Sequence, residues 1–558
     1  MSSSKLDAII AQLKAKKAAE AEAFATEQKT KLSTAISNAS APISEHSTAS
    51  GMHGELITYN SEQQQFVNLV PTGADCVLIG AAGTGKTTCS NGAIQALIQS
   101  GLVPILDSKG HKHLRSGVPG IVVIAYTKRA VNNIRKVVPQ EIKDNCITAH
   151  KLLEFKPEEL YITDPETGEE KRTMRFLPSR NAENPLPETI HTIIVEEASM
   201  LGTDLYALID AALGHKVQWI FIGDIQQLPP VFGPAILGYK LLELPVVELK
   251  QVYRQALESP IIRLAHRVLS GKPIPPAQLE EWNEKGKLTL HPWKKSLSAD
   301  VAIMTLSKFF TNAVDHGAYD PDNDIILIPY NEACGTIELN KRIANHLAKK
   351  RGAITYEVMA GFNKHYFSVG DKILYDRQDA VIIDIQPNKA YSGQKVQVPS
   401  RTLDYHGYNP NYAADVAKAS STIYTEIDID AILDAVSSDD ERVTAASHIL
   451  TIAKDTDNSD DVPIELSKAA DINSLLLGYA ITVHKSQGSE WERVFLCFHS
   501  SHATMTQREI LYTGITRARE TLYCICEPDT FVKGITKQRI KGNTLAEKAE
   551  YFKGRYVK

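Results

Sequence analysis

The sequence predicts an α/β protein built as two lobes, each with a parallel sheet. Two observations predict this class: short runs rich in β-branched residues alternate with helical patterns, and the alternation occurs in two separate sets. The first set contains "CVLIG", "GIVVIAY", "TIIVEEAS" and "VQWIFIGD", and the second contains "DIILIPY", "LLLGYAITVHKSQG", "RVFLCFH" and "TLYCICEP". A strand followed repeatedly by a helix indicates a parallel sheet that is covered on both faces.

The composition supports a globular protein of several domains. A chain of 558 residues exceeds what one hydrophobic core organises, and 43% hydrophobic with 23% charged residues is typical of globular proteins. Because the net charge is −5, nucleic-acid binding would require a local basic stripe. No apolar run spans a bilayer and no apolar segment follows Met1, so neither insertion nor secretion is expected. Seven scattered cysteines suit a reducing cytoplasm, with Cys524 and Cys526 interpreted as core packing.

Three segments depart from the alternation of strands and helices. Residues 5–37 are rich in Ala, Lys and Glu and predict a solvated helix, followed by a linker, so that the folded body begins near Leu56. Strand-like flanks around an Asp-Pro-Glu-Thr-Gly turn predict a projecting hairpin at Leu160–Pro178. From about Tyr356 to Asp471 the pattern predicts a β-rich insertion with an acidic tract. That tract is interpreted either as a solubilising loop or as a docking site for a basic partner.

The stretch "GAAGTGKTT" follows an apolar strand and satisfies the pattern G-x-x-x-x-G-K-[ST]. Its glycines let backbone N–H groups surround phosphates, Lys86 neutralises charge on the β- and γ-phosphates, and Thr87 is expected to hold Mg²⁺. The predicted cofactors are therefore ATP and Mg²⁺. The residues expected to surround the phosphates are Gly80, Ala81, Ala82, Gly83, Thr84, Gly85, Lys86, Thr87 and Thr88.

Further motifs supply the groups that phosphoryl transfer needs. "HTIIVEEASM" places Glu196 and Glu197 at the end of an apolar run, and we predict that Glu196 joins the magnesium shell and Glu197 orients the attacking water. Gln227 of "FIGDIQQLPPV" is predicted to sense the γ-phosphate. Arg254 and Arg517, from "LKQVYRQ" and "LYTGITRAR", are predicted to complete the site as arginine fingers when the lobes close. Hydrolysis would then move one lobe against the other, which indicates a motor.

Taken together, these strings resemble the superfamily 1 helicases, specifically the RecD/Dda-like branch (superfamily 1B) that moves 5′ to 3′ on single-stranded DNA. The resemblance runs from about Tyr59 to Pro528, and "HKSQG" favours this branch. It implies an ATP-dependent helicase that unwinds duplex DNA in replication, recombination or repair. "YNSEQQQFV" resembles the adenine-reading motif and implies that Gln63 binds the base, and Gly488 and Glu490 are also expected to bind nucleotide.

The same resemblance implies contacts to the DNA strand. "IAYTKRAV", "ITAHKLL", "TVHKSQG" and "ILIPYNEA" resemble stretches that touch DNA in this family. Taken alone, the histidines are more often core or capping residues, the threonines helix caps, and the tyrosine a packing group, so both interpretations stay open. The expected contacts are Tyr126, Thr127, Arg129, Thr148, His150, Asn331, Thr482 and His484.

The resemblance also implies two tandem RecA-like domains with a β-hairpin pin and an SH3-like insertion. In the family the pin splits the duplex. Single-strand-binding, replication or recombination proteins are expected partners of the N-terminal extension or the acidic tract. The compact domain set fits a phage or bacterial origin, with phage encoding expected, and action in the cytoplasm is expected, which is that of the bacterial host if the protein is phage-encoded. The expected divisions are an extension at 1–54, the first domain at 55–258 with the pin at about 154–186, the second domain at 259–354 and 472–558, and the insertion at 355–471.

Two positions depart from the family pattern. The usual Asp-Glu pair is Glu196 and Glu197 here, so the predicted metal ligand is one methylene longer and slower turnover is expected. Tyr126 stands where the family has a proline. Three alternatives to an unwinding motor stay open: a translocase that displaces proteins from DNA, a nucleotide-switched clamp that does not move, and RNA as the substrate.

Overall fold

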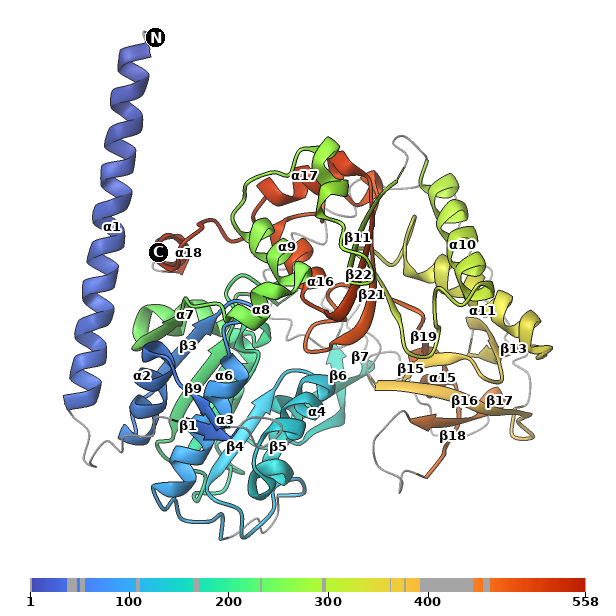
Figure 1. Ribbon diagram of the computed structural model, residues 1–558. Helices are drawn as coiled ribbons and strands as arrows, with labels where there is room; N and C mark the ends of the chain where they lie inside the picture. Colours follow the sequence, from blue (N-terminus) through green and yellow to red (C-terminus); the bar gives the residue numbers. More distant parts are fainter. Residues whose placement is uncertain are drawn as a thin grey trace. The chain divides into compact units, whose positions relative to one another are not determined.

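The computed structural model divides into two compact units, which are drawn in Figure 1. Unit 1 comprises Met1–Glu154, Pro178–Ile343 and Tyr479–Lys558, and unit 2 comprises Phe155–Leu177 and Ala344–Gly478. The structure describes residues 3–37, 48–50, 56–106, 111–163, 170–230, 233–293, 298–361, 363–375, 378–391, 445–454 and 462–556.

The first lobe of unit 1 contains a six-stranded sheet in the order β10-β3-β9-β8-β4-β5, in which every neighbouring pair is parallel. Its central strands are fully buried because helices pack against the sheet, as Figure 1 shows in blue, cyan and green. The strands are β3 (Cys76–Gly80), β4 (Ile121–Ala125), β5 (Cys146–Thr148), β8 (Thr192–Val195), β9 (Gln218–Gly223) and β10 (Val246–Leu249). The helices are α2 (Ser61–Leu69), α3 (Lys86–Gln99), α4 (Lys128–Val137), α5 (Ala149–Leu152), α6 (Thr203–Ala211), α7 (Ile236–Glu243) and α8 (Arg254–Glu258).

The second lobe of unit 1 has a five-stranded, all-parallel sheet in the order β11-β22-β21-β12-β20. Two parallel sheets with crossover helices confirm the predicted α/β class. The strands are β11 (Leu288–Pro292), β12 (Ile325–Ile328), β20 (Ala480–Thr482), β21 (Trp491–Phe498) and β22 (Ala518–Cys526). The helices are α9 (Pro260–Leu269), α10 (Ala299–Asp315), α11 (Thr336–Arg351), α16 (Arg508–Ile515), α17 (Pro528–Thr536) and α18 (Leu545–Tyr556).

Unit 2 is rich in antiparallel strands. Its five-stranded sheet, β18-β17-β16-β15-β19, closes over a core of residues such as Ile382, Leu450 and Ile452. A two-stranded sheet of β6 and β7 lies where the hairpin was predicted, and the turn between these strands lies outside the described residues, as do most of the acidic stretches. The elements are β6 (Phe155–Thr163), β7 (Glu170–Pro178), β13 (Thr355–Ala360), β14 (Asn363–Ser368), β15 (Lys372–Tyr375), β16 (Gln378–Pro387), β17 (Ala445–Lys454), β18 (Ile464–Lys468), α15 (Ala469–Ser474) and β19 (Leu476–Leu477).

The N-terminal helix α1 (Ser3–Ser37) corrects one prediction, because its second half is not solvated. Phe24, Gln28 and Leu32 are buried, and Leu32 belongs to the core of the first lobe. The Gln28 side chain donates to the Leu241 carbonyl at 3.3 Å and accepts from the Val246 N–H at 3.0 Å. The folded body therefore includes this helix. A short antiparallel pair joins β1 (Thr48–Ser50), which precedes the expected start, to β2 (Leu56–Thr58), which begins at it.

All seven cysteines are free and buried, which confirms that Cys524 and Cys526 serve core packing. Among the described residues, no helix has the length and apolar character that a membrane crossing requires.

Candidate nucleotide-binding site

The phosphate loop joins the end of β3 to the start of α3. Gly83 and Gly85 adopt left-handed backbone angles, with φ of +81° and +84°, and α3 begins at Lys86 immediately afterwards. The Lys86 ammonium donates to the carbonyls of Gly80 at 2.8 Å and Ala81 at 3.3 Å, which holds it across the loop. A glycine-rich turn that ends at a helix N-terminus directs several N–H groups toward one point, and this arrangement binds anions.

Close packing explains why the loop needs glycine at its two ends. A Cβ atom on Gly80 would lie 2.4 Å from Oγ1 of Thr84, whose hydroxyl donates to the Ala81 carbonyl at 2.8 Å. A Cβ atom on Gly85 would lie 2.5 Å from Nε2 of Gln63. The loop is therefore held by its neighbours in one conformation. Thr87 is exposed in the first turn of α3, and Thr88 follows it.

Gln63 is held against the phosphate loop by its own helix cap. Its side-chain oxygen accepts from the Asn60 N–H at 3.1 Å, and Asn60 accepts from the Gln63 N–H at 2.9 Å, which forms a capping box at the start of α2. The Gln63 amide donates to the Thr84 carbonyl at 3.4 Å, and the Tyr253 hydroxyl donates to its oxygen. Tyr253 was not predicted from the sequence, although it directly precedes Arg254 in "QVYRQ". The predicted adenine contact of Gln63 stays a prediction.

The two adjacent acids lie where β8 ends. Burial, and then the charge of Glu197, raises the pKa of Glu196 to about 7. Glu197 has a left-handed backbone (φ +50°), which is uncommon for a residue other than glycine. Within the described part of the chain, neither Oε2 of Glu197 nor Oε1 of the buried Gln227 has a hydrogen-bond partner. Buried polar atoms without partners indicate a site that a ligand or water completes.

The residues present fit a nucleotide-bound magnesium ion better than a metal held by protein alone. Among the described residues, no group of three or more His, Cys, Asp or Glu side chains is placed to hold a metal ion. Magnesium in phosphoryl-transfer sites takes one or two protein ligands and completes its octahedron with phosphate oxygens and waters. The exposed Thr87 hydroxyl and the Glu196 carboxylate have the chemistry of those ligands.

A tyrosine hydroxyl links the phosphate loop to the second lobe within unit 1. The Ala82 N–H donates to the Tyr512 hydroxyl at 2.7 Å, and that hydroxyl donates to Oδ2 of Asp224 at 2.6 Å. Both Asp224 and Tyr512 are fully buried. One side chain from α16 therefore contacts the phosphate loop and the segment that follows β9.

Two further hydrogen bonds run beside this link. The Leu228 N–H donates to Oγ1 of Thr513 at 3.2 Å, and the Gln487 amide donates to the Leu228 carbonyl at 2.8 Å. No role was predicted for four residues of this link, although each stands within a predicted motif: Asp224, Gln487, Tyr512 and Thr513. The only signal for them was their place inside motifs that were already selected.

The structure describes the side chain of one of the two predicted arginine fingers. The side chain of Arg254, the first residue of α8, lies outside the described residues. Arg517 is 3% exposed, and its guanidinium donates to the carbonyls of Thr513 at 3.1 Å and Ser489 at 3.0 Å within the second lobe. In this conformation Arg517 supports its own lobe, so its role in transfer stays a prediction.

Gly488 contacts helix α4 and Glu490 contacts the second lobe, and their predicted contact with nucleotide stays a prediction. The Gly488 carbonyl accepts from the Asn133 amide at 3.0 Å, and a Cβ atom on Gly488 would lie 2.8 Å from Oγ1 of Thr127. Glu490 is exposed and pairs with Arg519 at 3.1 Å. The structure thus brings Gly488 to helix α4 of the first lobe, next to a predicted DNA contact.

The predicted DNA contacts of the first lobe gather at the carboxyl ends of β4 and β5. Thr127 caps α4 and Thr148 caps α5, so both hydroxyls accept backbone N–H groups. The rings of Tyr126 and His150 meet edge to face with centroids 5.5 Å apart. The Arg129 guanidinium lies 5.3 Å from the centre of the Trp491 ring. The threonines are thus helix caps, as the alternative interpretation proposed, and a capping hydroxyl keeps a lone pair for other partners.

The predicted contacts of the second lobe lie beyond β12 and β20. Asn331 is exposed, and its side-chain oxygen accepts from the Thr336 hydroxyl at 2.9 Å. Thr482 is buried, and its hydroxyl accepts from the Lys485 N–H at 3.3 Å. Burial, and then the nearby charge of Arg539, lowers the pKa of His484 to about 4, so its ring is neutral at pH 7.

Two protein families match parts of the chain. The family described as AAA domain matches residues 63–233, which contain the phosphate loop and the acids after β8. The family described as UvrD-like helicase C-terminal domain matches residues 477–525, which contain β20, β21, α16 and most of β22.

Curated relatives extend the similarity over most of the chain. The ATP-dependent RecD2 DNA helicase of Deinococcus radiodurans is 26% identical over 474 residues, which are 84% of this chain and 49% of the relative. The RecBCD enzyme subunit RecD of Buchnera aphidicola subsp. Schizaphis graminum is 22% identical over 481 residues, 82% of this chain and 71% of the subunit. The chain therefore spans about half the length of the first relative. Among solved structures, a Bacteroides Pif1 helicase in complex with ADP-AlF3 and single-stranded DNA matches with a TM-score of 0.42 and 14% identity, covering 84% of this chain and 92% of that one.

Proposed function

We propose that this chain, a superfamily 1B helicase of the RecD type by its sequence similarity, is an ATP-dependent motor that moves 5′ to 3′ on single-stranded DNA and unwinds the duplex ahead. The substrate is DNA in replication, recombination or repair, and the energy source is ATP with Mg²⁺. The observation that carries the proposal is the hydrogen-bonded link from Ala82 through Tyr512 to Asp224. It joins the phosphate loop to a helix of the other lobe, so a change at the phosphates is transmitted to that lobe.

The chemistry of transfer is divided among few side chains. Lys86 neutralises the charge that develops on the β- and γ-phosphates, and the loop amides bind their oxygens. Glu197, whose buried Oε2 has no hydrogen-bond partner among the described residues, orients the attacking water. Gln227, whose buried Oε1 also has no partner among the described residues, contacts the γ-phosphate by donating from its Nε2–H group. A bound magnesium ion, held by Thr87 and Glu196, would neutralise charge between the phosphates.

The DNA strand is proposed to follow the carboxyl ends of the strands in both lobes. Parallel sheets bind ligands at this edge, and the predicted contacts after β4, β5, β12 and β20 all lie there. The spacing between the lobes changes with the nucleotide state. Each lobe then binds the strand tightly in turn, and the strand advances. The β6–β7 hairpin is proposed as the pin that separates the complement.

The test is unwinding of two matched partial duplexes, one with a 5′ single-stranded tail and one with a 3′ tail, with Lys86→Ala as the inactive control. Separation of the 5′-tailed duplex alone supports the proposed polarity. Preference for the 3′ tail would overturn the polarity and keep the motor. DNA-stimulated ATP hydrolysis without separation of either duplex would instead support a translocase that displaces proteins. Strand binding without stimulated hydrolysis would support a nucleotide-switched clamp.

A further inference from the structure

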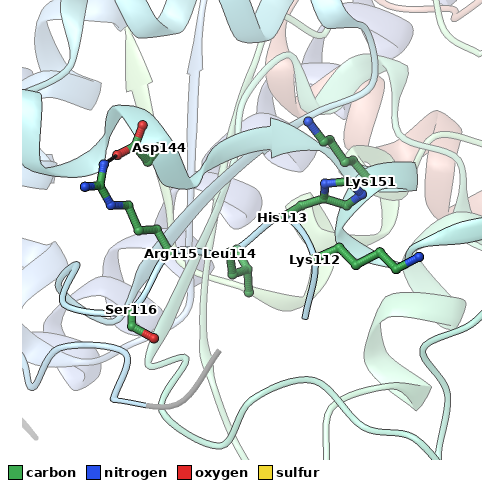
Figure 2. A pocket seen from close by; sticks show the side chains of 7 residues that line it. All are labelled: Lys112, His113, Leu114, Arg115, Ser116, Asp144 and Lys151. Atoms are coloured by element: carbon green, nitrogen blue, oxygen red, sulfur yellow. Dashed lines mark hydrogen bonds and ion pairs between the residues drawn. The ribbon is translucent and has the colours of Figure 1, made fainter. Parts of the chain in front are cut away.

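A basic pocket lies on the first lobe, at the edge of the sheet formed by β5. It has a volume of about 500 Å³, and Figure 2 shows the side chains that line it. Four of the seven lining residues carry basic side chains, and Asp144 is the only carboxylate among the described residues of the lining. The lining residues are Lys112, His113, Leu114, Arg115, Ser116, Asp144 and Lys151.

Buried partners hold the segment 111–116 that supplies most of this pocket. The His111 ring is buried; its Nε2–H donates to the Leu152 carbonyl at 2.9 Å and its Nδ1 accepts from the Leu114 N–H at 3.0 Å. The Lys112 N–H donates to the Glu154 carboxylate at 2.6 Å. This segment is thereby fixed against α5 and the residues that follow it, so its side chains are presented in a defined arrangement.

The charges of the pocket are only partly neutralised. Arg115 forms an ion pair with Asp144, so the carboxylate of the described lining is already neutralised by this arginine. In the described part of the chain, no carboxylate lies within ion-pair distance of the Lys112 or Lys151 ammonium. Partial burial, and then the charge of Arg135, lowers the pKa of Lys151, as expected for an ammonium group among cations. Two lysines that line one pocket, with no paired acid in the described part of the chain, make it a site for the phosphates of an anionic strand.

The position of the pocket indicates which anion. Lys151 directly follows His150, and the Thr148 hydroxyl accepts the Lys151 N–H at 3.2 Å. The pocket is therefore continuous with the predicted strand contacts after β5. A DNA strand that touches Thr148 and His150 presents its next phosphates within the span of a few side chains, since extended nucleic acid carries one phosphate per nucleotide.

We propose that Lys112 and Lys151 form a phosphate-binding station for single-stranded DNA, which extends the path of the strand beyond Thr148 and His150 along the β5 edge. The station rests on the proposed function, because it needs a strand on this face. It adds a segment, 111–116, to the DNA-binding surface. Since phosphates carry no base information, the station contributes affinity and register without sequence preference.

The experiment measures the affinity of a labelled single-stranded oligonucleotide by fluorescence anisotropy at several NaCl concentrations between about 50 and 200 mM. The variant is Lys112→Gln/Lys151→Gln. Each phosphate contact to a single strand contributes about 0.7 to the slope of log K against log salt, so two lost contacts lower the slope by about 1.4 and weaken binding about 25-fold at 0.1 M salt. The conservative double variant Lys112→Arg/Lys151→Arg is expected to retain the slope.

A matched control removes charge elsewhere on the same lobe. Lys216 is exposed and lies just before β9, at the amino ends of the strands and therefore away from the carboxyl ends that the DNA is proposed to follow, so Lys216→Gln is expected to retain the wild-type slope within about 0.3. If the wild-type protein binds DNA and the Gln double variant shows the same slope of log K against log salt, Lys112 and Lys151 do not bind phosphates. The proposed function is then unaffected. If the wild-type protein fails to bind single-stranded DNA, the proposed function itself is wrong. If Lys216→Gln lowers the slope as much as a pocket lysine, the effect is one of general charge and the station is also overturned.

Discussion

Replacing Gly85 with alanine tests whether the loop "GAAGTGKTT" binds phosphate through one enforced conformation. Gly85 has φ of +84°, where an alanine costs about 1–2 kcal/mol. The added Cβ atom would lie 2.5 Å from Nε2 of Gln63, whereas ordinary contact begins at 3.4 Å, so the two must separate by about 0.9 Å. That shift breaks the hydrogen bond from Gln63 to the Thr84 carbonyl, worth about 1 kcal/mol.

In the free Gly85→Ala protein the loop can relax and avoid the backbone strain and the clash with Gln63. Phosphate binding requires the original loop conformation, so both free-energy costs lower the affinity for nucleotide. Their sum of about 2–3 kcal/mol corresponds to ADP binding that is about 30- to 150-fold weaker in Gly85→Ala. The assay is titration with a fluorescent ADP in the presence of Mg²⁺. Gly73→Ala is the matched control, since Gly73 has φ of +77° with no atom within 4 Å of an added Cβ. It carries the same backbone strain away from the loop, so its ADP affinity is expected to equal that of the wild type. Equal ADP affinities for the two variants would refute the reasoning.

Three further predictions follow from buried polar groups. In a double-mutant cycle on ATP hydrolysis, Tyr512→Phe and Asp224→Asn are expected to show a coupling energy of about 1.5–3 kcal/mol in kcat/KM, and additive effects would contradict the link. Because burial lowers the pKa of His502 to about 4, its ring stays neutral in the folded protein while the unfolded chain binds a proton below its ordinary value of about 6.5. Stability is therefore lost as pH falls from about 6.5 toward 4, and the melting temperature of His502→Gln is expected to fall less over that window than that of the wild type. Arg180→Ala leaves the buried Glu154 carboxylate without its arginine partner and is expected to lower the free energy of unfolding by about 3 kcal/mol, measured as a lower melting temperature. The double variant Arg180→Ala/Glu154→Gln, which also removes the buried charge, is expected to lower the melting temperature less.

The sequence predicted the phosphate loop because its chemistry is local. The glycines, Lys86 and Thr87 lie within eight residues, and the strand and helix on either side follow from ordinary periodicity. The same locality predicted Glu196 and Glu197 at the end of β8. The left-handed backbone of Glu197 was not predictable, because surrounding structure imposes that conformation on a residue that does not favour it.

Contacts between distant residues were missed for a physical reason. Tyr512 and Asp224 are separated by 288 positions, and no pattern in either stretch shows that their side chains meet. Helix α1 is different, since its sequence held a signal. Phe24, Gln28 and Leu32 recur every four residues and so share one face of the helix. Charged and alanine residues between them obscured that stripe, and a polar Gln in its centre made it resemble a solvated face.

The position of the Tyr512 hydroxyl limits how strongly the two lobes respond to nucleotide. Ala82 belongs to the phosphate loop, and its N–H is one of the donors expected to bind phosphate. The hydroxyl and a phosphate oxygen would therefore compete for the same hydrogen. Nucleotide binding then favours release of Tyr512 from the loop, and release of Tyr512 favours nucleotide binding by the same factor. Since one hydrogen bond to an uncharged donor is worth about 0.5–1.5 kcal/mol, this link alone changes affinity by about 2- to 13-fold. A larger coupling would require the neighbouring bonds from Leu228 to Thr513 and from Gln487 to Leu228 to change together with it.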